Sequence, residues 1–341
     1  MASNSSITAA IEQLATIGAL GRYQLYEHEV YRVLAAIGVS VPRHRFVSTK
    51  DILGSTGPFS FSDSSSPQVV VKVVSQTITH KEAAGGVRIV ENESTAIASA
   101  ARDMTDRITA AGNDLDGVLV VEHVPHRRGI GNEWILGFRH TVDFGPVVSL
   151  SKGGGDAEAF AQNLSPAVLF LPPVARDFVS HSLHDSPVLQ TVAVEAREAL
   201  IPRLTSLVLE FCELAAATSS ATSPDSPVHL RELEVNPFVV NGEGALVPLD
   251  GLARIEPAPD DSSTADARTR QDRSTQSLQP FFRPKGVAVV GVSAGDSAKM
   301  GNIIASNLFG LGRRDVSCTN VRGGIVKLGS RTVPLYHSLK E

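Results

Sequence analysis

Two short stretches of this sequence combine residue types that can bind phosphates and a metal ion. The first, VVVKVVSQTITHKEAAGGV, sets Lys72 in an apolar, β-branched run and then places His80 and Lys81 before the glycines Gly85 and Gly86. A strand that is followed by a polar loop and glycines can bring backbone N–H groups and a cation up to phosphates. The histidine adds a nitrogen that either accepts a phosphoryl group or simply forms a hydrogen bond, and this stretch leaves both roles open.

The second stretch, RELEVNPFVVNGEGALVPLD, alternates polar and apolar residues. The strand period of two predicts an apolar face that carries Leu233, Val235 and Val239. It also predicts an opposite face with two carboxylates and an amide, made of Glu232, Glu234, Asn236 and Phe238. Such oxygen ligands suit a hard cation such as Mg²⁺. The alternative is an exposed acidic strand at the edge of a sheet.

The turn of the predicted hairpin decides whether a further ligand joins this face. A five-residue loop over residues 241–245 makes Asn236 and Asp250 cross-strand neighbours. A two-residue turn at the start of the same loop would put Asp250 on the opposite face, because side chains alternate along a strand. With the longer loop, the hypothesis is a metal site of Glu234, Asn236 and Asp250.

Carboxylates also stand at the ends of two further predicted strands. Glu122 ends the run GVLVVE, and Glu133 opens EWILGF after the irregular segment HVPHRRGIGN. Either carboxylate could accept hydrogen bonds from a ribose or an adenine amino group, or could lie solvated in a loop. The three glycines of SKGGGDAE either pass close to a ligand or form only a flexible turn.

Hydrophobic periodicity predicts the elements that must position these residues. Residues 25–37 have helical spacing and end at Gly38, a typical C-terminal cap. Residues 92–111 are also predicted to be helical, and residues 192–217 form one or two helices. Strands are predicted at residues 39–49, 69–74, 117–123, 134–138 and 147–150, with a hairpin over 232–240 and 245–249.

The composition is that of a chain that buries a core and has neither nucleic-acid nor membrane partners. The 341 residues are 42% apolar, carry a net charge of −5 and include 5% aromatic residues, which disfavours a nucleic-acid surface. No apolar run approaches the ~18–20 residues that span a bilayer. The N-terminus lacks a basic start and carries Glu12, so it is predicted to be a short amphipathic helix. Cys212 and Cys318 lack metal-site spacing, and a reducing, cytoplasmic location is expected.

The C-terminal part of the chain changes character twice. Residues 257–280 contain one leucine and no other large apolar residue, so a disordered linker is predicted there. Residues 281–341 begin with a strand, a glycine-rich turn and a helix, as Rossmann-type units do. About sixty residues are fewer than the ~100–150 of a full doubly wound domain, so this unit is expected to be partial.

The order of the motifs resembles that of a known family. The chain contains, in sequence, a helix with E-x-E (Glu27, Glu29), then VxVP, VVVKVVS…THKEAAGGV, VLVVEHV, EWILGF, DFGPVV, KGGGDAE, ELEVNPFVV and PLDG. Over about residues 25–255 this order is similar to the ATP-grasp domain of the NDP-forming acyl-CoA synthetases, closest to the ADP-forming acetate–CoA ligase branch. The tail, FFRPKGVAVVGVS…GNIIASNLFGLG…NVRGGIVKLGS, resembles the start of the CoA-binding domain of the same superfamily.

The resemblance implies an α/β chain with an ATP-grasp fold of two α+β subdomains, followed by a partial Rossmann-like CoA-binding unit. The domains expected from it are a helical extension (1–24), the nucleotide-binding ATP-grasp domain (25–256), the linker (257–280) and the partial CoA-binding domain (281–341).

The resemblance also implies roles for single residues. Lys72 matches the strand lysine that contacts nucleotide phosphates, and THKEAAGG, with both its glycines, matches the loop that covers them. His80 falls on the histidine that relays the phosphoryl group, next to Lys81. Glu122 falls on the hinge glutamate near adenine and ribose, and Glu133 on a glutamate of the nucleotide or phosphoryl-transfer site.

Metal and CoA ligands are implied in the same way. Asn236 and Asp250 fall on the Mg²⁺ ligands, with Glu234 beside them. In the tail, Gly291 and Ser293 match the turn that approaches CoA. Arg322 takes the place of a usual lysine near the CoA phosphates.

The reaction implied is carboxylate + CoA + ATP ⇌ acyl-CoA + ADP + phosphate, through acyl phosphate and phosphohistidine. The expected cofactors are ATP/ADP, Mg²⁺ and CoA, and the substrate is a small carboxylic acid or its acyl phosphate. The ligase domain that carries the main phosphohistidine is not part of this sequence. An alpha-type partner subunit in a hetero-oligomer is therefore expected.

The sequence departs from the family pattern at several places. Gln162 stands where the family has an aspartate, and no arginine follows. The segment between Glu122 and Glu133 is a few residues longer than usual. Gln162, the missing arginine and the partial CoA-like tail favour an alternative, a non-catalytic regulatory or assembly subunit that retains the ATP-grasp fold. A third hypothesis, a ligase that joins a carboxylate to an amine, leaves the CoA-like tail unexplained.

Overall fold

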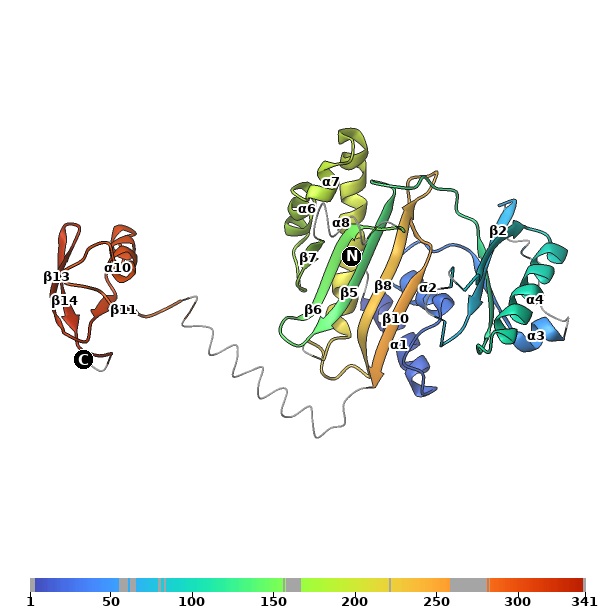
Figure 1. The fold of residues 1–341 in the computed structure, drawn as a ribbon, viewed down its shortest axis with the longest axis horizontal. Coiled ribbons are helices and arrows are strands. Elements are labelled where there is room, and N and C mark those ends of the chain that lie inside the picture. The colour runs from blue at the N-terminus through green and yellow to red at the C-terminus, as the bar shows by residue number, and fades with distance from the viewer. Residues whose placement is uncertain are drawn as a thin grey trace. The chain divides into compact units, whose positions relative to one another are not determined.

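The structure is a computed structural model. It describes residues 4–54, 61, 66–78, 81–82, 84–155, 157, 167–220, 222–257, 281 and 283–339. The chain divides into two compact units, with the boundary between residues 264 and 265 (Figure 1). His80, Gln162 and the predicted linker after residue 257 lie outside the described residues.

The larger subdomain of the first unit is built on a six-stranded antiparallel sheet with the order β10-β8-β5-β6-β7, in which β9 also pairs with β8. Its strands are β5 (Glu133–Thr141), β6 (Gly145–Lys152), β7 (Val168–Phe170), β8 (Val228–Val240), β9 (Leu246–Pro248) and β10 (Gly251–Pro257). The helices that share its core are α1 (Asn4–Ala19), α2 (Glu27–Ala36), α6 (Arg176–His184), α7 (Pro187–Gln190) and α8 (Val194–Ala217).

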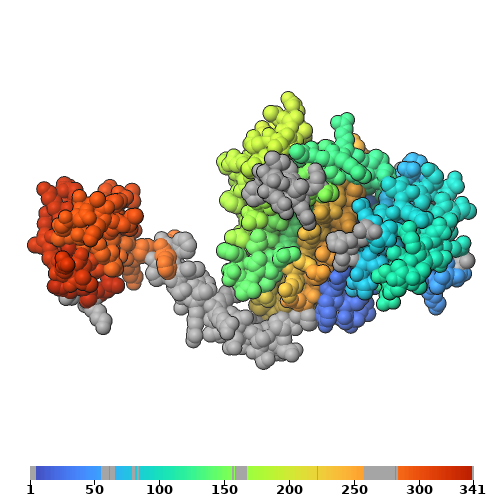
Figure 2. Space-filling view, in the orientation of Figure 1, coloured from blue at the N-terminus to red at the C-terminus, as the bar shows by residue number. Residues whose placement is uncertain are grey.

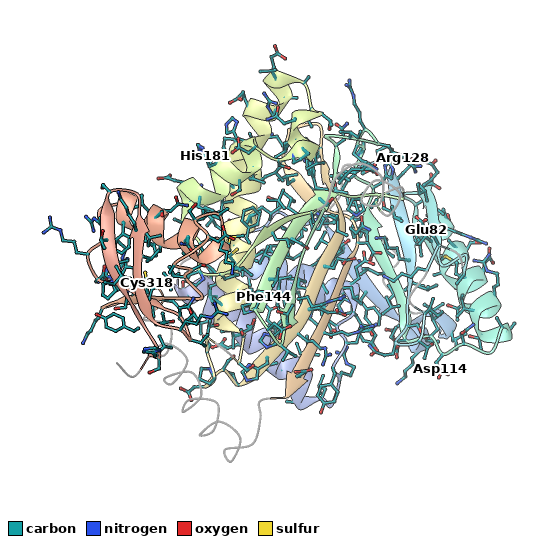
Figure 3. The ribbon with its side chains drawn as sticks, turned by 60° about the vertical axis from the view of Figure 1, so that its left-hand side comes forward. Glu82, Asp114, Arg128, Phe144, His181 and Cys318 are labelled. Atoms are coloured by element: carbon teal, nitrogen blue, oxygen red, sulfur yellow. The ribbon has the colours of Figure 1, made fainter. Side chains whose placement is uncertain are left out.

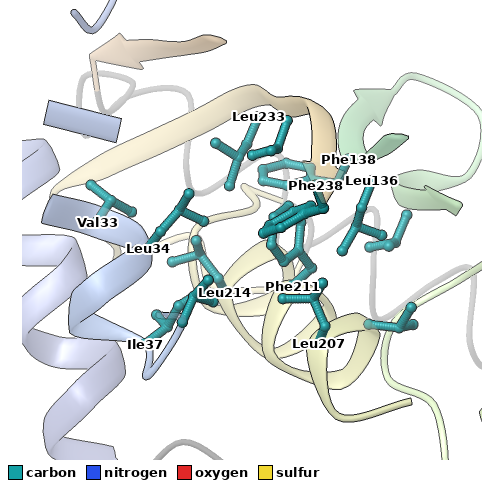
Figure 4. Close-up of a cluster of buried hydrophobic side chains, with 14 of the residues drawn as sticks. Val33, Leu34, Ile37, Leu136, Phe138, Leu207, Phe211, Leu214, Leu233 and Phe238 are labelled. Atoms are coloured by element: carbon teal, nitrogen blue, oxygen red, sulfur yellow. The ribbon is translucent and has the colours of Figure 1, made fainter. Parts of the chain in front are cut away.

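Helix α8 forms because its apolar residues recur every three or four positions, which gives one stripe to bury against the sheet. This stripe consists of Leu200, Leu204, Leu207, Phe211 and Leu214. Phe211 meets Phe238 of β8 edge to face, with ring centroids 6.1 Å apart. Leu34 of α2 belongs to the same core (Figure 4). Residues 192–217 therefore contain one long helix, not two.

The smaller subdomain holds a four-stranded antiparallel sheet in the order β1-β4-β2-β3. Helix α4 buries Ile97, Ala101, Met104 and Ile108 in a core that it shares with β2 and β4. Figure 2 shows this subdomain, in cyan, beside the larger one. Its elements are β1 (His44–Ser48), α3 (Thr49–Leu53), β2 (Gln68–Val74), β3 (Val87–Glu91), α4 (Ser94–Ala110) and β4 (Gly117–Glu122).

The predicted faces of β8 are wrong at one end of the strand. Phe238 was expected on the polar face, but it is fully buried in the core with Leu233 and Val235. The pairing with β5 explains this difference, since Val235 lies opposite Leu136 whereas Phe238 lies opposite Trp134. Three steps along β8 thus match two steps along β5. One extra residue reverses the alternation of side chains, as in a β-bulge.

The second unit contains a β-α-β arrangement. Helix α10 (Met300–Gly310) connects the parallel strands β11 (Val287–Val290) and β12 (Val316–Thr319). Strand β14 (Arg331–Tyr336) runs parallel to β12, and β13 (Gly324–Leu328) runs antiparallel to β14. The sheet order is β11-β12-β14-β13.

Within the described ranges, no helix combines the length and the apolar character that crossing a membrane requires.

The burial of His28 on α2 leads to a prediction of how the stability of the first unit depends on pH. The side chain is buried, stacks on Phe46 with ring centroids 4.8 Å apart, and offers a buried Nδ1 without a hydrogen-bond partner among the described residues. Burial lowers the pKa of His28 to about 4. The unfolded chain binds this proton near pH 6.5 and the folded chain only near pH 4, so stability falls as the pH drops through this window.

Between pH 7 and pH 5, we expect His28 to account for a loss of roughly 2 kcal/mol in the free energy of unfolding. Urea unfolding at both pH values should show a smaller loss in His28→Phe than in the wild-type protein. His181→Phe, an exposed position on α6, is the control and should keep the wild-type pH dependence. An unchanged pH dependence in His28→Phe would contradict this account.

Candidate functional site

A cavity of about 1080 Å³ is lined by residues of both subdomains of the first unit. Figure 3 labels two of them, Glu82 from the loop after β2 and Arg128 from the loop before β5. Part of the wall is apolar and consists of Val70, Val87, Ile89, Val121, Val124, Pro237 and Leu249. Six residues that the sequence singled out also line the cavity, namely Lys72, Lys81, Glu122, Glu133, Asn236 and Asp250.

The hairpin of β8 and β9 brings Asn236 and Asp250 together. Val240 pairs with Leu246, so residues 241–245 form a five-residue loop. Asn241 stabilises this loop, because its Oδ1 accepts hydrogen bonds from the backbone N–H groups of residues 243 and 245, at 3.1 and 2.8 Å. Asn236 N then donates to Asp250 O over 3.1 Å. The longer loop therefore forms, and the two residues are cross-strand neighbours.

A buried carboxylate on α2 holds both lysines of the cavity. Glu27 Oε1 lies 2.7 Å from Lys72 Nζ, and Glu27 Oε2 lies 2.6 Å from Lys81 Nζ. The Tyr31 hydroxyl lies 2.7 Å from Glu27 Oε1, and Lys72 also donates to the Leu249 carbonyl. The Glu27 side chain is 1% exposed. Its burial favours the neutral acid, but the two ammonium groups outweigh burial, so the pKa of Glu27 is lowered and the carboxylate is charged.

Asp250 completes a group of four charges. Its Oδ1 lies 3.4 Å from Lys81 Nζ, and the side chain is 53% exposed at the edge of this group. Partial loss of solvation and the nearby charge of Glu27 raise the pKa of Asp250, against the opposing effect of the lysines. Loss of solvation disfavours the charged form of Lys81 too, but Glu27 and Asp250 outweigh it and raise the pKa of Lys81. Two cations thus lie beside two carboxylates.

The glycines after β6 pack tightly against the strands that carry Glu133 and Asn236. A Cβ on Gly153 would lie 2.5 Å from the carbonyl carbon of Trp134. A Cβ on Gly154 would lie 2.8 Å from Glu133 Oε2, and Gly154 N donates to Asn236 Oδ1 over 2.9 Å. Only glycine fits at these two positions. This close approach orients the Asn236 amide and brings the backbone of the run into the cavity wall.

The second pair of glycines shapes the turn that follows Lys81. Gly86 N donates to Lys81 O over 2.6 Å, and a Cβ on Gly86 would lie 2.4 Å from Val73 Cγ2. Gly85 has φ +64°, and Arg107 donates to its carbonyl. Neither glycine is among the described residues of the cavity wall. Their contacts fix the turn that presents Lys81.

The two predicted strand-end glutamates lie on the cavity wall with defined contacts. Glu122 ends β4, where its backbone N donates to Arg43 O over 2.8 Å. Glu133 begins β5, and its Oε2 accepts a hydrogen bond from Gly129 N over 2.7 Å. Glu133 Oε1 lies 4.0 Å from His126 Nε2.

Glu234 does not line the cavity, although it precedes Asn236 by only two residues. Its pKa is raised by partial burial and by the charge of Glu232. Glu232 itself lies 3.2 Å from an Arg139 nitrogen and 2.7 Å from an Arg254 nitrogen. Two arginines thus neutralise Glu232 at this end of β8. The alternative interpretation of the sequence, an exposed acidic strand at the edge of a sheet, does not hold, because β8 pairs with β10 on one side and β5 on the other.

No role was predicted for Glu27 or Tyr31 from the sequence. The sequence feature that could have indicated a role is the spacing of Glu27 and Tyr31, a carboxylate and a phenol at positions i and i+4 of an otherwise apolar helix face. Polar groups on a buried face need partners, which makes them candidates for a site. Their partners lie 45 or more residues away in the sequence.

In the second unit, the predicted residues follow two adjacent parallel strands. Gly291, with φ +83°, directly follows β11 and donates its N–H to Thr319 O of β12 over 2.9 Å. Ser293 N donates to Asn302 Oδ1 over 2.8 Å. Arg322 N donates to Asn320 Oδ1 over 2.9 Å. Gly291, Ser293 and Arg322 thus lie at one edge of this sheet.

Comparison with known proteins agrees with the observed fold. Residues 17–255 match the family model of an ATP-grasp domain. The chain belongs to the ATP-grasp family. The expected ATP-grasp fold is thereby confirmed, with an antiparallel sheet and helices in each of two subdomains.

The relatives of this ATP-grasp chain include ADP-forming acyl-CoA ligases. It is 25% identical over 233 residues to the beta subunit of acetate–CoA ligase [ADP-forming] I of Pyrococcus furiosus. The matched region covers 65% of this chain and 88% of that subunit. It is 27% identical over 236 residues to 4-hydroxybutyrate–CoA ligase [ADP-forming] of Nitrosopumilus maritimus, covering 65% of this chain. The match spans only 29% of that ligase. The chain is thus homologous to the ATP-grasp, beta-type part of these enzymes.

A solved structure shares the ATP-grasp fold. The dinucleotide forming acetyl-coenzyme A synthetase 1 of Ca. Korarchaeum cryptofilum, in complex with coenzyme A and Ca-AMPCP, matches with a TM-score of 0.55 at 18% identity. The match covers 72% of this chain and all of that chain. The same protein in complex with coenzyme A and Mg-AMPPCP matches with a TM-score of 0.52 at 19% identity, with the same coverage of both chains.

Removing the buried carboxylate should destabilise the first unit strongly. We expect Glu27→Ala to lower the free energy of unfolding by roughly 3–5 kcal/mol, because it leaves Lys72 and Lys81 without their shared buried counter-charge. Glu256→Ala, which removes one member of an exposed ion pair with Arg231, is the control and should cost at most about 1 kcal/mol. Urea unfolding measures both values, and equal losses would contradict the role of Glu27.

The glycine run offers a matched pair of substitutions. A methyl group on Gly153 would collide with the backbone of Trp134, whereas one on Gly155 would meet nothing within 4 Å. We expect Gly153→Ala to destabilise the protein by roughly 1–3 kcal/mol and Gly155→Ala to change stability by less than about 0.5 kcal/mol. Thermal unfolding of the two variants checks this difference. Similar melting temperatures would show that the run is a flexible turn after all.

Proposed function

We propose that this chain binds Mg-ATP in its cavity and performs the nucleotide half of an ADP-forming acyl-CoA synthetase reaction. The overall reaction is carboxylate + CoA + ATP ⇌ acyl-CoA + ADP + phosphate. One observation carries the proposal: six of the residues that the motifs assign to phosphate, base and metal binding line a single cavity, namely Lys72, Lys81, Glu122, Glu133, Asn236 and Asp250. Among them are two cations, which phosphates require, and two oxygen ligands, which Mg²⁺ requires.

Each residue has a role that follows from its chemistry. Lys72 and Lys81 neutralise the nucleotide phosphates, and Asn236 and Asp250 hold the metal ion through side-chain oxygens. Mg²⁺, when bound, supplies further charge neutralisation for phosphoryl transfer. Glu122 lies in the wall with apolar residues and can accept a hydrogen bond from the base or the ribose. The donor set fits a metal–nucleotide complex.

The phosphoryl acceptor in this proposal is His80, which directly precedes Lys81 in the chain. The bond between the γ-phosphorus and the bridging oxygen of ATP breaks, ADP leaves with that electron pair, and an imidazole nitrogen forms the new bond to phosphorus. Neutral imidazole is a competent nucleophile for this step near neutral pH.

The acyl half of the reaction is assigned to an alpha-type partner subunit. The Pyrococcus furiosus relative carries the name of a beta subunit, and the 4-hydroxybutyrate–CoA ligase extends far beyond the matched region. Gly291, Ser293 and Arg322 of the second unit contribute to CoA binding in this proposal. Their position after two adjacent parallel strands supports this role, because such strand ends commonly bind ligands.

A non-catalytic subunit that binds nucleotide remains the second candidate, because Gln162 stands where the family has an aspartate. Incubation with [γ-³²P]ATP and Mg²⁺, alone and with a candidate alpha-type subunit, separates the two. The catalytic proposal expects an acid-labile label that His80→Ala abolishes and that His181→Ala retains. Tight Mg-ATP binding with no label and no turnover in any mixture would support the non-catalytic subunit instead.

The proposed role of Asp250 as a metal ligand leads to a direct prediction. We expect Asp250→Asn to weaken Mg-ATP binding about tenfold or more, because a neutral amide replaces a charged oxygen ligand. Asp103→Asn removes a carboxylate from an exposed ion pair with Arg88 and serves as the control. Titration calorimetry at saturating Mg²⁺ measures both affinities. Equal affinities would remove Asp250 from the metal site.

A further inference from the structure

Asn320, directly after β12, joins three segments at one edge of the sheet of the second unit. Its backbone N donates to Tyr336 O of β14 over 2.9 Å. Its side-chain Nδ2 donates to Val292 O, in the turn after β11, over 2.6 Å. Its Oδ1 accepts the Arg322 N–H over 2.9 Å, and its carbonyl accepts the Gly323 N–H over 2.8 Å. One residue thus holds together the two turns that carry the predicted CoA residues.

The backbone N–H groups of the turn after β11 are used inside the protein. Gly291 N and Val292 N both donate to Thr319 O, over 2.9 and 3.2 Å. Ser293 N donates to Asn302 Oδ1, and Ser293 O accepts from Asn302 Nδ2, each over 2.8 Å. Asn302 is 1% exposed, so this pair of hydrogen bonds is buried at the start of α10. The three N–H groups therefore cannot bind a phosphate as those of a glycine-rich phosphate loop do.

Arg322 offers a cation at the same edge of the sheet. Its side chain is exposed and makes no ion pair or hydrogen bond with the part of the chain that the structure describes. Its backbone lies in a tight turn that begins at Asn320 and ends at Gly323, residue types that favour the first and last positions of such a turn. The turn decides where the guanidinium can lie.

We infer that Asn320 is a positioning residue for CoA binding, which holds the Arg322 turn against the turn after β11 so that the Arg322 guanidinium binds a phosphate of CoA. The inference rests on the proposed CoA role of the second unit and adds the residue through which Arg322 acts. Without the Asn320 amide, Val292 O loses this donor and the Arg322 N–H loses its acceptor. Asn302 holds the turn after β11 from the side of α10 and bonds to Ser293 instead.

A double-mutant cycle on the affinity for CoA, measured by titration calorimetry on the full chain, tests this inference. Arg322→Gln should weaken CoA binding about tenfold, because it removes a hydrogen bond between charged groups. Asn320→Ala should weaken binding by about the same factor, and the double variant should lose little more, since both changes remove the same contact. Asn302→Ala combined with Arg322→Gln should instead multiply the two losses. Asn307→Ala, at an exposed position on α10, is the control and should bind CoA like the wild-type protein.

Two further measurements separate positioning from a general loss of structure. Asn320→Ser keeps an oxygen that can accept the Arg322 N–H, but its side chain is too short to reach Val292 O. It should keep the wild-type circular dichroism and still weaken CoA binding about as much as Asn320→Ala. Added salt should weaken CoA binding to the wild-type protein more than to Arg322→Gln or Asn320→Ala, because both variants remove the charge from the phosphate.

The outcomes separate this inference from the proposed function. Absence of CoA binding to the wild-type protein would overturn the CoA role of the second unit itself. Losses that multiply between Asn320→Ala and Arg322→Gln, or a wild-type affinity in Asn320→Ser, would overturn only the positioning role of Asn320. Weaker binding in Asn320→Ala with the salt dependence of the wild-type protein would overturn that role as well.

Discussion

The pairing of the buried Glu27 carboxylate with two ammonium groups is the constraint on which the site depends. A charge that is removed from water must find an opposite charge and hydrogen-bond donors, and Glu27 finds Lys72, Lys81 and the Tyr31 hydroxyl. Glu27 belongs to the larger subdomain, whereas Lys72 belongs to the smaller one. The same contacts therefore join the two subdomains and place both cations in the cavity. Stability and the proposed phosphate binding share one set of atoms.

Backbone geometry completes the opposite wall. The five-residue loop between β8 and β9 sets the register that brings Asp250 beside Asn236, and Gly154 N orients the Asn236 side chain. A side chain at residue 153 would collide with the backbone of β5, and one at residue 154 would collide with the Glu133 carboxylate. The cavity thus combines ion-paired charged side chains on one wall with an amide that the backbone orients on the other. This arrangement is consistent with the proposed binding of phosphates and a metal ion.

Family membership and local chemistry bear on different parts of the function. ATP-grasp membership accounts for the two subdomains, and residues of both line the cavity. The segment before β5, which departs from the family pattern, contributes His126 opposite Glu133. The second unit adds a β-α-β arrangement that the ATP-grasp match, which ends at residue 255, does not include. The second unit is therefore a part of the chain that the ATP-grasp match does not explain.

The sequence by itself determined the elements and most of the residues of the site. Helices such as α2 and α8 and strands such as β2 and β4 follow from local hydrophobic periodicity, and the order of motifs indicated the ATP-grasp fold. Lys72, Glu122 and Asn236 stood out because polar residues in or at the end of apolar strands are unusual. The tertiary structure alone decided the register of β8 and β9, the burial of Phe238 and the role of Glu27. Those features arise from contacts between residues that are distant in the sequence, such as Lys72 with Leu249, and no local pattern encodes such contacts.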